Sequence, residues 1–500
     1  MRNVSVIRSV AAILIVSLYS AGLRAQAAGT AQGSHDRMPI TTSSPEAREL
    51  FEQGVVAWEN LHIRKAMECW RSAIDKDPNF LLARLYILER IPDPDQQAAE
   101  QKKAGALMDS VTPDERLMAE WILAEDRNDI IAAVASMNEL LARNPRDKHL
   151  LWFAALSLGA KYKQWERAAE LAEQALKIDP DFAGALNNQG YNYAFLGQFD
   201  KAFPIMKHYI EVLPGEPNPQ DSYAEILRMA GHFDEALEHY NAALSIEPNF
   251  GESLLGLADT YALMGEEDKA RARYDIAIQH AYTKAYAAMW RLRRAATYVR
   301  EKHFAEADAA FLEAARLAHE DGVAQMEADA YRMMALYQQD YPTALRSLDK
   351  AEQILSHGHD TSPSARQEEM ALIQRTAIYH AIQHGRLHVA SETLARLKKL
   401  NDGSHNPNIE VAYHASAGMV LMAGKKWLEA IPHLEEDARD AFSMKLLITA
   451  YREAGLTAKS ERTARELAAL NAPTIDQALV VPEFRAQRTR AASKSPEHRE

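Results

Sequence analysis

Apolar and polar positions along most of this chain recur at helical spacing and are interrupted at regular intervals. Apolar side chains return every three or four residues, as in Ala236, Tyr240 and Ala243, which is typical of amphipathic helices. Prolines punctuate the pattern, and a proline cannot continue a helix beyond its first turn. The pattern predicts an all-α chain built from short, paired helices.

The interruptions keep a fixed step of 34 residues, so equivalent positions form columns. These columns are Ala168, Ala202, Ala236 and Ala270; Ala175, Tyr209, Ala243 and Ala277; Pro180, Pro214 and Pro248; and Gly197, Gly231 and Gly265. We expect the alanines to lie where two helices cross closely and the glycines to end the first helix in a left-handed conformation. Asp200, Asp234 and Asp268 follow the glycines by three residues and are expected to cap the second helix.

This set of columns resembles the tetratricopeptide repeat, a 34-residue helix-turn-helix unit. The resemblance is strongest from His149 to Lys284 and looser on both sides. It implies a right-handed superhelical solenoid of about eleven or twelve repeats. The predicted organisation is 45–147 for N-terminal repeats (81–147 degenerate), 148–284 for the regular array, 285–475 for looser repeats and 484–500 for a disordered basic tail.

The unit that begins at Pro217 departs from its neighbours. Pro217 and Pro219 are expected to delay the first helix of this unit until near Asp221, which would then cap it. Asp221 is therefore left out of the candidate binding residues.

The first 27 residues have the order of a secretory signal. Arg2 and Arg8 precede an apolar stretch, 10–18, and a small-residue exit follows at Ala25-Gln26-Ala27. The apolar stretch is shorter than the ~20 residues that a spanning helix needs. We expect cleavage near Ala27, a flexible leader over 28–44 and a periplasmic or secreted bacterial protein with no stable membrane span. An uncleaved anchor is the alternative.

Composition and charge narrow the function. The chain has 500 residues, 57 basic and 70 acidic side chains and a net charge of −13, which argues against nucleic acid as a main partner. Cys69 is the single cysteine, so neither an internal disulfide nor a cysteine-based zinc site is available.

Catalytic motifs are lacking, and we predict no enzyme activity, no catalytic residue, no cofactor and no metal. Gly418 to Lys425 has the wrong glycine spacing for a phosphate loop, and Lys426 replaces the required Ser or Thr. His380, His384 and His388 are spaced i, i+4, i+8 and leave a remote metal-binding alternative, although Gly385 should end that helix.

The resemblance implies a concave groove lined by the first helices of successive units. The candidate partner-binding residues on these helices are Asn187, Asn188, Tyr191, Phe195, Glu225, Arg228 and Asp259. Asn187, Tyr191 and Phe195 form an i, i+4 series on one helix face. The alternative is that these side chains are only solvated surface.

One binding mode of the resembled family is not expected. Family members that hold a C-terminal carboxylate do so with lysines and an arginine at first-helix positions. Phe153, Glu252 and Gly256 occupy those positions here, and Asn188 alone matches. A single asparagine cannot neutralise a carboxylate.

The sequence predicts a protein-protein interaction scaffold of the bacterial periplasm or cell envelope. Its partner would be an envelope protein that contributes a peptide or helix to the groove. The alternative is a module that binds exopolysaccharide or peptidoglycan through the same aromatic and amide side chains.

Overall fold

A computed structural model describes residues 37–492, apart from 61, 89–90, 92–93, 128, 359–360 and 405. Within these residues the chain forms twelve consecutive helix pairs followed by a last helix, α26 (Ile475–Ala492). Each pair is a helix, a short turn and a second helix that packs back on the first. The prediction of an all-α superhelical solenoid is confirmed.

The first four pairs are α2 (Pro45–Glu59) with α3 (Ile63–Lys76), α4 (Leu81–Leu88) with α5 (Pro94–Leu107), α6 (Pro113–Asp126) with α7 (Ile130–Arg143), and α8 (Lys148–Ala160) with α9 (Trp165–Ile178). The next four are α10 (Ala183–Phe195) with α11 (Phe199–Val212), α12 (Pro217–Ala230) with α13 (Phe233–Ile246), α14 (Gly251–Met264) with α15 (Glu267–Gln279), and α16 (Lys284–Arg300) with α17 (Phe304–Asp321).

The last four are α18 (Ala324–Tyr337) with α19 (Tyr341–His357), α20 (Pro363–Gln383) with α21 (Leu387–Asp402), α22 (Pro407–Ala423) with α23 (Trp427–Glu435), and α24 (Ala441–Glu453) with α25 (Thr457–Ala468).

The predicted columns form the core between adjacent helices. All four alanines of the column from Ala168 to Ala270 are fully buried, and so are Ala175, Tyr209, Ala243 and Ala277. Each unit buries its apolar face mainly against its neighbours, so clusters of buried apolar side chains follow one another along the array.

The turns confirm one capping prediction and contradict another. Gly231 and Gly265 end α12 and α14 with φ of 87° and 80°, in the left-handed region that favours glycine. The aspartates that follow do not cap the second helices, since Asp234 and Asp268 lie one residue inside helices whose N-caps are His232 and Glu266. In this first turn their negative charge interacts favourably with the positive end of the helix dipole.

Helix α12 begins earlier than predicted. It starts at Pro217 with Glu216 as its N-cap, so both Pro217 and Pro219 lie in its first turn, where backbone N–H groups have no intrahelical partner. Asp221 therefore lies inside the helix, not at its start. Its carboxylate is buried and accepts a hydrogen bond from the Ser253 hydroxyl at 2.6 Å.

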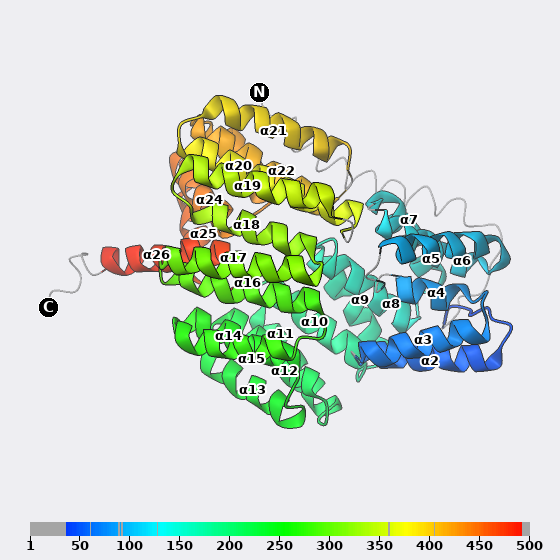
Figure 1. Ribbon diagram of the computed structural model, residues 1–500. Coiled ribbons are helices and arrows are strands. Elements are labelled where there is room, and N and C mark those ends of the chain that lie inside the picture. Colours follow the sequence, from blue (N-terminus) through cyan, green and yellow to red (C-terminus); the bar gives the residue numbers. More distant parts are fainter. Residues whose placement is uncertain are drawn as a thin grey trace.

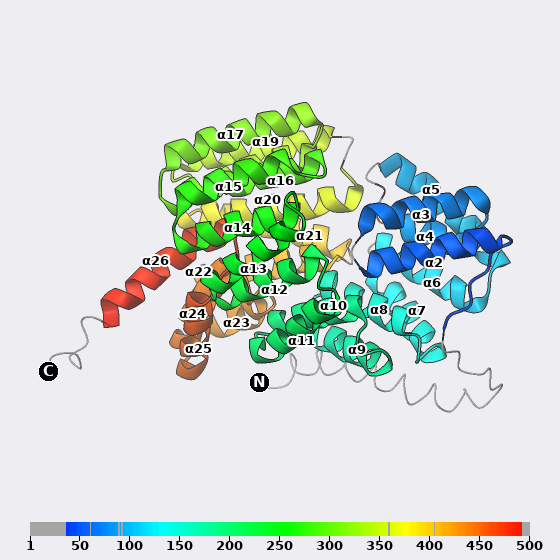
Figure 2. The same cartoon turned by 90° about the horizontal axis from the view of Figure 1, so that it is seen from below.

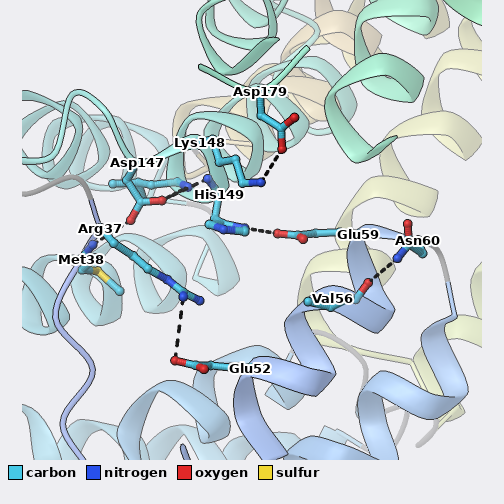
Figure 3. Close-up of polar contacts among 11 residues, drawn as sticks. Arg37, Met38, Glu52, Val56, Glu59, Asn60, Asp147, Lys148, His149 and Asp179 are labelled. Carbon is cyan, nitrogen blue, oxygen red and sulfur yellow. Dashed lines mark hydrogen bonds and ion pairs between the residues drawn. The ribbon is translucent and has the colours of Figure 1, made fainter. Parts of the chain in front are cut away.

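The described part of the leader follows a fixed path instead of being flexible. The Met38 N–H donates to the Asp147 carboxylate at 2.7 Å (Figure 3). The Thr41 N–H donates to Glu115 at 2.6 Å. The Ser43 N–H donates to Asp77 at 2.8 Å. These three acceptors are buried and belong to the first, third and fourth helix pairs, so they hold residues 38–43 across this part of the array.

The tail prediction is wrong for the residues that the structure describes. Residues 484–492 continue helix α26, because Ile475, Ala478 and Val481 bury one face of this helix. The Arg485 guanidinium donates to the Ala468 carbonyl at 2.7 Å and to the Asn471 carboxamide at 2.8 Å. The predicted signal sequence, residues 28–36 of the predicted leader and residues 493–500 lie outside the described residues.

The array curves so strongly that segments far apart in the sequence meet, although α2 and α26 lie on opposite sides of the molecule (Figures 1 and 2). The Asn471 amide donates to the Met229 carbonyl at 3.3 Å, and α26 packs against α16. His62 near the N-terminal end contacts Glu216 at 3.0 Å. Among the described helices, none is both long enough and apolar enough to cross a bilayer.

Candidate functional site

A chamber of about 1010 Å³ lies where the C-terminal repeats meet the inner face of α8 and α10. One side is formed by α8, the α8–α9 turn, α9 and α10. The other is formed by the start of α22 and the turn between α23 and α24. Its lining includes Trp58, Trp152, Lys163, Trp165, Asn187, Asn188, Tyr191, Asn192, Phe195, Pro407, Glu410, Glu436 and Arg439.

Four of the seven predicted binding residues line this chamber together, and all four come from α10. Asn187, Tyr191 and Phe195 share one helix face, as their spacing predicts. The Tyr191 and Phe195 rings stack with centroids 6.3 Å apart, and Phe195 is 38% exposed. Trp165 of α9 lies 5.7 Å from the Phe195 ring, so three aromatic rings form one apolar wall.

Carboxamides provide the polar part of the same wall. The Asn192 Nδ2 donates to the Asn188 Oδ1 at 3.0 Å, which fixes both side chains. The Asn187 Oδ1 is buried and accepts no hydrogen bond within the described residues. A buried acceptor without a donor is unfavourable, so a ligand N–H or O–H group that reached this oxygen would relieve the cost.

Two cations close the chamber beside the aromatic wall. The Arg439 guanidinium carbon lies 3.8 Å from the Trp165 ring centroid and 5.8 Å from that of Phe195. Burial lowers the pKa of the Arg439 guanidinium, and burial together with the charge of Arg439 lowers the pKa of the Lys163 amine. No ion pair involving either cation occurs among the described residues.

The carboxylates of the chamber fall into two groups. Glu435 and Asp437 are paired within the chain, with Lys459 at 2.9 Å and Arg375 at 2.8 Å. Glu410 and Glu436 are exposed at the chamber, and neither pairs with Lys163 or Arg439. The chamber thus presents unpaired charges of both signs.

A second, more polar cavity of about 970 Å³ adjoins the chamber. It lies between the stretch 97–130 on one side and the stretches 362–368 and 403–408 on the other. Tyr162, Lys163, Pro407 and Asn408 line both cavities. The two together form a long cleft between the N-terminal and C-terminal repeats.

The other three predicted binding residues belong to a polar network inside the solenoid. The Tyr191 hydroxyl donates to Glu225 at 2.7 Å, and Glu225 accepts from Arg228 at 2.8 Å. Arg228 and Asp259 are only 4% and 2% exposed. These two side chains therefore hold neighbouring helices together and offer little surface to a partner.

This network follows the repeat itself. Tyr191, Glu225, Asp259 and Arg293 stand 34 residues apart on α10, α12, α14 and α16. The Arg293 Nη1 donates to Asp259 at 2.6 Å, and the Asp259 charge raises the pKa of the Arg293 guanidinium. Hydrogen bonds between side chains of this column thus join α10 to α12 and α14 to α16.

The C-terminal segment covers part of the inner face beyond α10. Ile475 packs with Leu292, Val299 and Met334 of α16 and α18, and Asn471 contacts the end of α12. The groove predicted to run along all first helices is therefore open at α8 and α10 and occupied by the protein's own chain near α16.

The histidine series takes part in backbone contacts. The His380 Nε2 lies 2.6 Å from the Ala335 carbonyl, and both ring nitrogens of His384 face backbone carbonyls. The His388 side chain is 85% exposed and lies beyond the helix end. Within the described residues, no group of three or more His, Cys, Asp or Glu side chains is placed to hold a metal ion.

A polar contact of His149 joins the first pair to the N-terminus of α8 (Figure 3). His149 contacts Glu59, and the neighbouring Lys148 pairs with Asp179 at 2.6 Å. Lys148 also lies 4.8 Å from the Phe182 ring centroid. These contacts fix α8 between α2 and α10, and so position one side of the chamber.

Glu267→Gln is expected to stabilise the protein at alkaline pH. Glu267 is 6% exposed and its Oε2 has no hydrogen-bond partner, and burial, opposed by Arg300, raises the pKa of this carboxyl to about 7. The folded state therefore retains the proton more strongly than the unfolded chain, so stability decreases as pH rises from about 4.5 through 7. Glutamine mimics the protonated form without this loss.

We expect the variant to gain on the order of 1–3 kcal/mol in the free energy of unfolding at pH 8 and nothing at pH 4. Urea titrations at the two pH values measure this difference. Glu173→Gln, on an exposed carboxylate paired with Lys177, is the matched control and should change stability at neither pH. A gain of equal size at pH 4 would contradict the assigned cause.

Several lining residues escaped the sequence analysis. Lys163 stands in the column of Gly197, Gly231 and Gly265 and adopts a left-handed φ of 56°. A lysine at a position where later units have glycine was visible in the sequence and could have marked this turn. Trp165 lies at the start of a second helix and not on a predicted groove face. No feature of the sequence pointed to Arg439. Its turn lies about 270 residues from Trp165 in the chain and meets α9 only through the curvature of the array.

The fold defines an all-α solenoid of tetratricopeptide-like repeats. Residues 227–296, from α12 into α16, match the tetratricopeptide repeat family. This part of the chain is thus a run of tetratricopeptide repeats, as the sequence columns predicted.

Two curated relatives share this repeat character at low identity. Anaphase-promoting complex subunit CDC16 of Saccharomyces cerevisiae is 22% identical over 262 residues, which is 49% of this chain and 30% of that protein. Anaphase-promoting complex subunit 3 of Schizosaccharomyces pombe is 22% identical over 233 residues, 46% of this chain and 35% of that protein. The chain spans about a third of the length of these relatives.

Solved structures with similar repeats include a tetratricopeptide repeat protein from Parabacteroides merdae. It is 18% identical, with a TM-score of 0.36, and the match covers 57% of this chain and 99% of that one. A structure of MamA is 17% identical, with a TM-score of 0.28, over 32% of this chain and 93% of that one.

Proposed function

We propose that this protein is a non-enzymatic interaction scaffold that binds an extended segment of a partner protein in the chamber. The observation that carries the proposal is the convergence of Asn187, Asn188, Tyr191 and Phe195 on one open cavity. Aromatic rings offer stacking area, and carboxamides can both donate to and accept from a peptide backbone.

The size of the site favours an extended ligand. The chamber is at the upper end of the range of about 300–1,000 Å³ for small-molecule pockets, and it continues into the second cavity. A chain that runs through this cleft would contact repeats from both halves of the array. Such a ligand would therefore stabilise the closed curvature of the solenoid.

The cellular setting that we propose is the bacterial periplasm or cell envelope, or the outside of the cell. It rests on the signal-like order of Arg2, Arg8 and Ala25-Gln26-Ala27. The partner would then be an envelope protein. That the two curated relatives are named as subunits of a complex supports a role in assembly.

A glycan is the second candidate ligand, and a specific observation favours it. Tyr191, Phe195 and Trp165 present ring faces beside the Asn187 and Asn188 carboxamides, and sugar rings stack on aromatic faces while their hydroxyls bind amides. An exopolysaccharide or peptidoglycan strand could occupy the same cleft.

Replacing Asn188 and Phe195 by alanine is expected to abolish retention of the partner without unfolding the protein. Both side chains line the chamber and neither is fully buried, so their loss removes contact area but leaves the core intact. The measurement is a crosslinked pull-down from an envelope extract, followed by mass spectrometry and glycan analysis, with thermal unfolding recorded in parallel.

The matched control is Asn241→Ala with Phe304→Ala. Phe304 is also 38% exposed, and Asn241 is exposed, but neither lines a cavity beside α10. A discrete protein lost only with the chamber variant supports the scaffold. Glycan recovered without protein would favour the second candidate, and a ligand retained equally by both variants would place the binding site elsewhere.

A further inference from the structure

Unpaired charges of both signs line the chamber, and this pattern restricts the ligand. Lys163 and Arg439 lie together beside Trp165, while Glu410 comes from the start of α22 and Glu436 from the turn before α24. We propose that the chamber recognises a peptide segment of mixed charge, with an acidic side chain against Lys163 and Arg439 and a basic side chain against Glu410 and Glu436. This inference rests on the proposed function of the chamber.

The two cations are held apart from the carboxylates by contacts of their own. The Arg439 guanidinium is fixed on the Trp165 ring by a cation–π contact, and the Lys163 amine donates to the Ala160 carbonyl at 2.7 Å. The same charge on both groups makes their proximity unfavourable, and of the protein's own carboxylates Glu166 acts on Arg439 without forming an ion pair with it. A ligand carboxylate would relieve this repulsion and form charge-assisted hydrogen bonds to both.

The carboxylates argue against a polyanionic ligand. Glu410 and Glu436 face the same space without a cation of the protein within ion-pair distance, apart from a marginal approach of His414 to Glu410 at 4.0 Å. The negative charges of an acidic glycan in the chamber would lie near both carboxylates, which would repel them. A peptide that contains one residue of each sign meets both requirements, and its backbone N–H can satisfy the buried Asn187 Oδ1.

The backbone at Lys163 allows its side chain to be removed without straining the turn. Lys163 adopts a φ of 56° in a column where Gly197, Gly231 and Gly265 occupy the same turn. A left-handed conformation is less favourable for a residue with a Cβ atom than for glycine. Lys302 and Lys425 share this conformation at turns that do not line the chamber, so they provide matched controls.

The test begins with a selection of phage-displayed random octapeptides on the immobilised full chain. The expected result is enrichment of peptides that contain both an acidic and a basic residue. The best binder is then synthesised with a fluorescent label, together with versions in which its acid or its base is replaced by glutamine. Affinities are measured by fluorescence anisotropy for the wild type and its variants.

Lys163→Gly should bind the selected peptide about tenfold less tightly, with a folding stability equal to or above that of the wild type. Arg439→Gln should weaken binding similarly, and neither variant should discriminate the acidic peptide from its glutamine version. Lys302→Gly should share the stability effect and leave binding unchanged. Glu410→Gln with Glu436→Gln should remove the preference for the basic residue.

Several results would overturn this inference. Selected peptides without acidic residues, or full affinity in Lys163→Gly and Arg439→Gln, would contradict it and leave the chamber as a neutral peptide site. Tight binding of an oligogalacturonate that depends on Lys163 and Arg439 would replace the peptide by an acidic glycan. The absence of any enriched octapeptide would count against the proposed function itself.

Discussion

Replacing Arg375 by leucine is expected to lower the free energy of unfolding by about 3–5 kcal/mol at pH 8. Arg375 on α20 lies 2.8 Å from both Asp437 and Asp440, and all three side chains are largely buried. Without the guanidinium these carboxylates stay buried with no counter-charge. The loop 436–440, which carries Arg439 into the chamber, would also lose its connection to α20.

The pH dependence of this loss identifies its cause. Burial raises the pKa of Asp437 to about 7 and that of Asp476 to about 6 even with Arg375 present. Removing the cation raises both further, so the variant should lose less stability at pH 5, where the carboxyls are protonated, than at pH 8. Urea titrations at both pH values measure the difference.

Arg316→Leu is the control for Arg375→Leu. Arg316 also contacts two carboxylates, Glu313 at 2.6 Å and Glu320 at 2.5 Å, but its side chain is 51% exposed. Exposed ion pairs contribute little, and we expect a change below about 1 kcal/mol. Equal losses in the two variants would show that the buried cluster around Arg375 has no special role.

Gly256→Ala is expected to destabilise the protein by about 3 kcal/mol, whereas Gly105→Ala should be neutral or stabilising. A Cβ atom at Gly256 would lie 2.2 Å from Cε1 and 2.3 Å from Cζ of Tyr240. The Tyr240 ring is 1% exposed, so it has no free space into which to move. The helices α13 and α14 would have to separate.

The comparison with Gly105 isolates packing from helix propensity. Gly105 lies in α5, is exposed, and has no atom within 4 Å of the position its Cβ would take. Alanine favours a helix over glycine by about 0.5–1 kcal/mol at such a position. Thermal unfolding of both variants measures whether each substitution lowers or raises the stability of the protein. A stabilising Gly256→Ala would contradict the close approach of α14 to Tyr240.

Adjacent repeats were predictable because the contacts that build them are local. The alanine column at Ala168 and the aromatic residues at Tyr240 and Tyr274 specify which faces meet across one turn, and the structure buries them there. Prediction failed at helix starts, where Pro217 is compatible with a first turn and Asp234 lies inside a helix. In both places the backbone geometry of the turn outweighs the preference of a single residue.

The candidate site was predictable in part for the same reason. Asn187, Asn188, Tyr191 and Phe195 share a helix; the resemblance implied that they line a groove, and helical spacing placed Asn187, Tyr191 and Phe195 on one face. Asp259 occupies the position equivalent to Tyr191 on a later helix, and Arg228 that of Ala194, yet both are buried among polar partners. Their environment depends on the charges of adjacent repeats. Assigning groove positions to each repeat separately does not take those neighbouring charges into account.

The sequence by itself determined the repeat, its core columns, the glycine-ended helices and the aromatic and amide face of α10. The tertiary structure decided which part of the inner face stays open and what closes it. Arg439 meets Trp165, and Asn471 meets Met229, only because small rotations between successive pairs accumulate along the array. The accumulated rotation cannot be read from any local pattern in the sequence. The chamber and the positions of its two cations are therefore seen only in the complete tertiary structure.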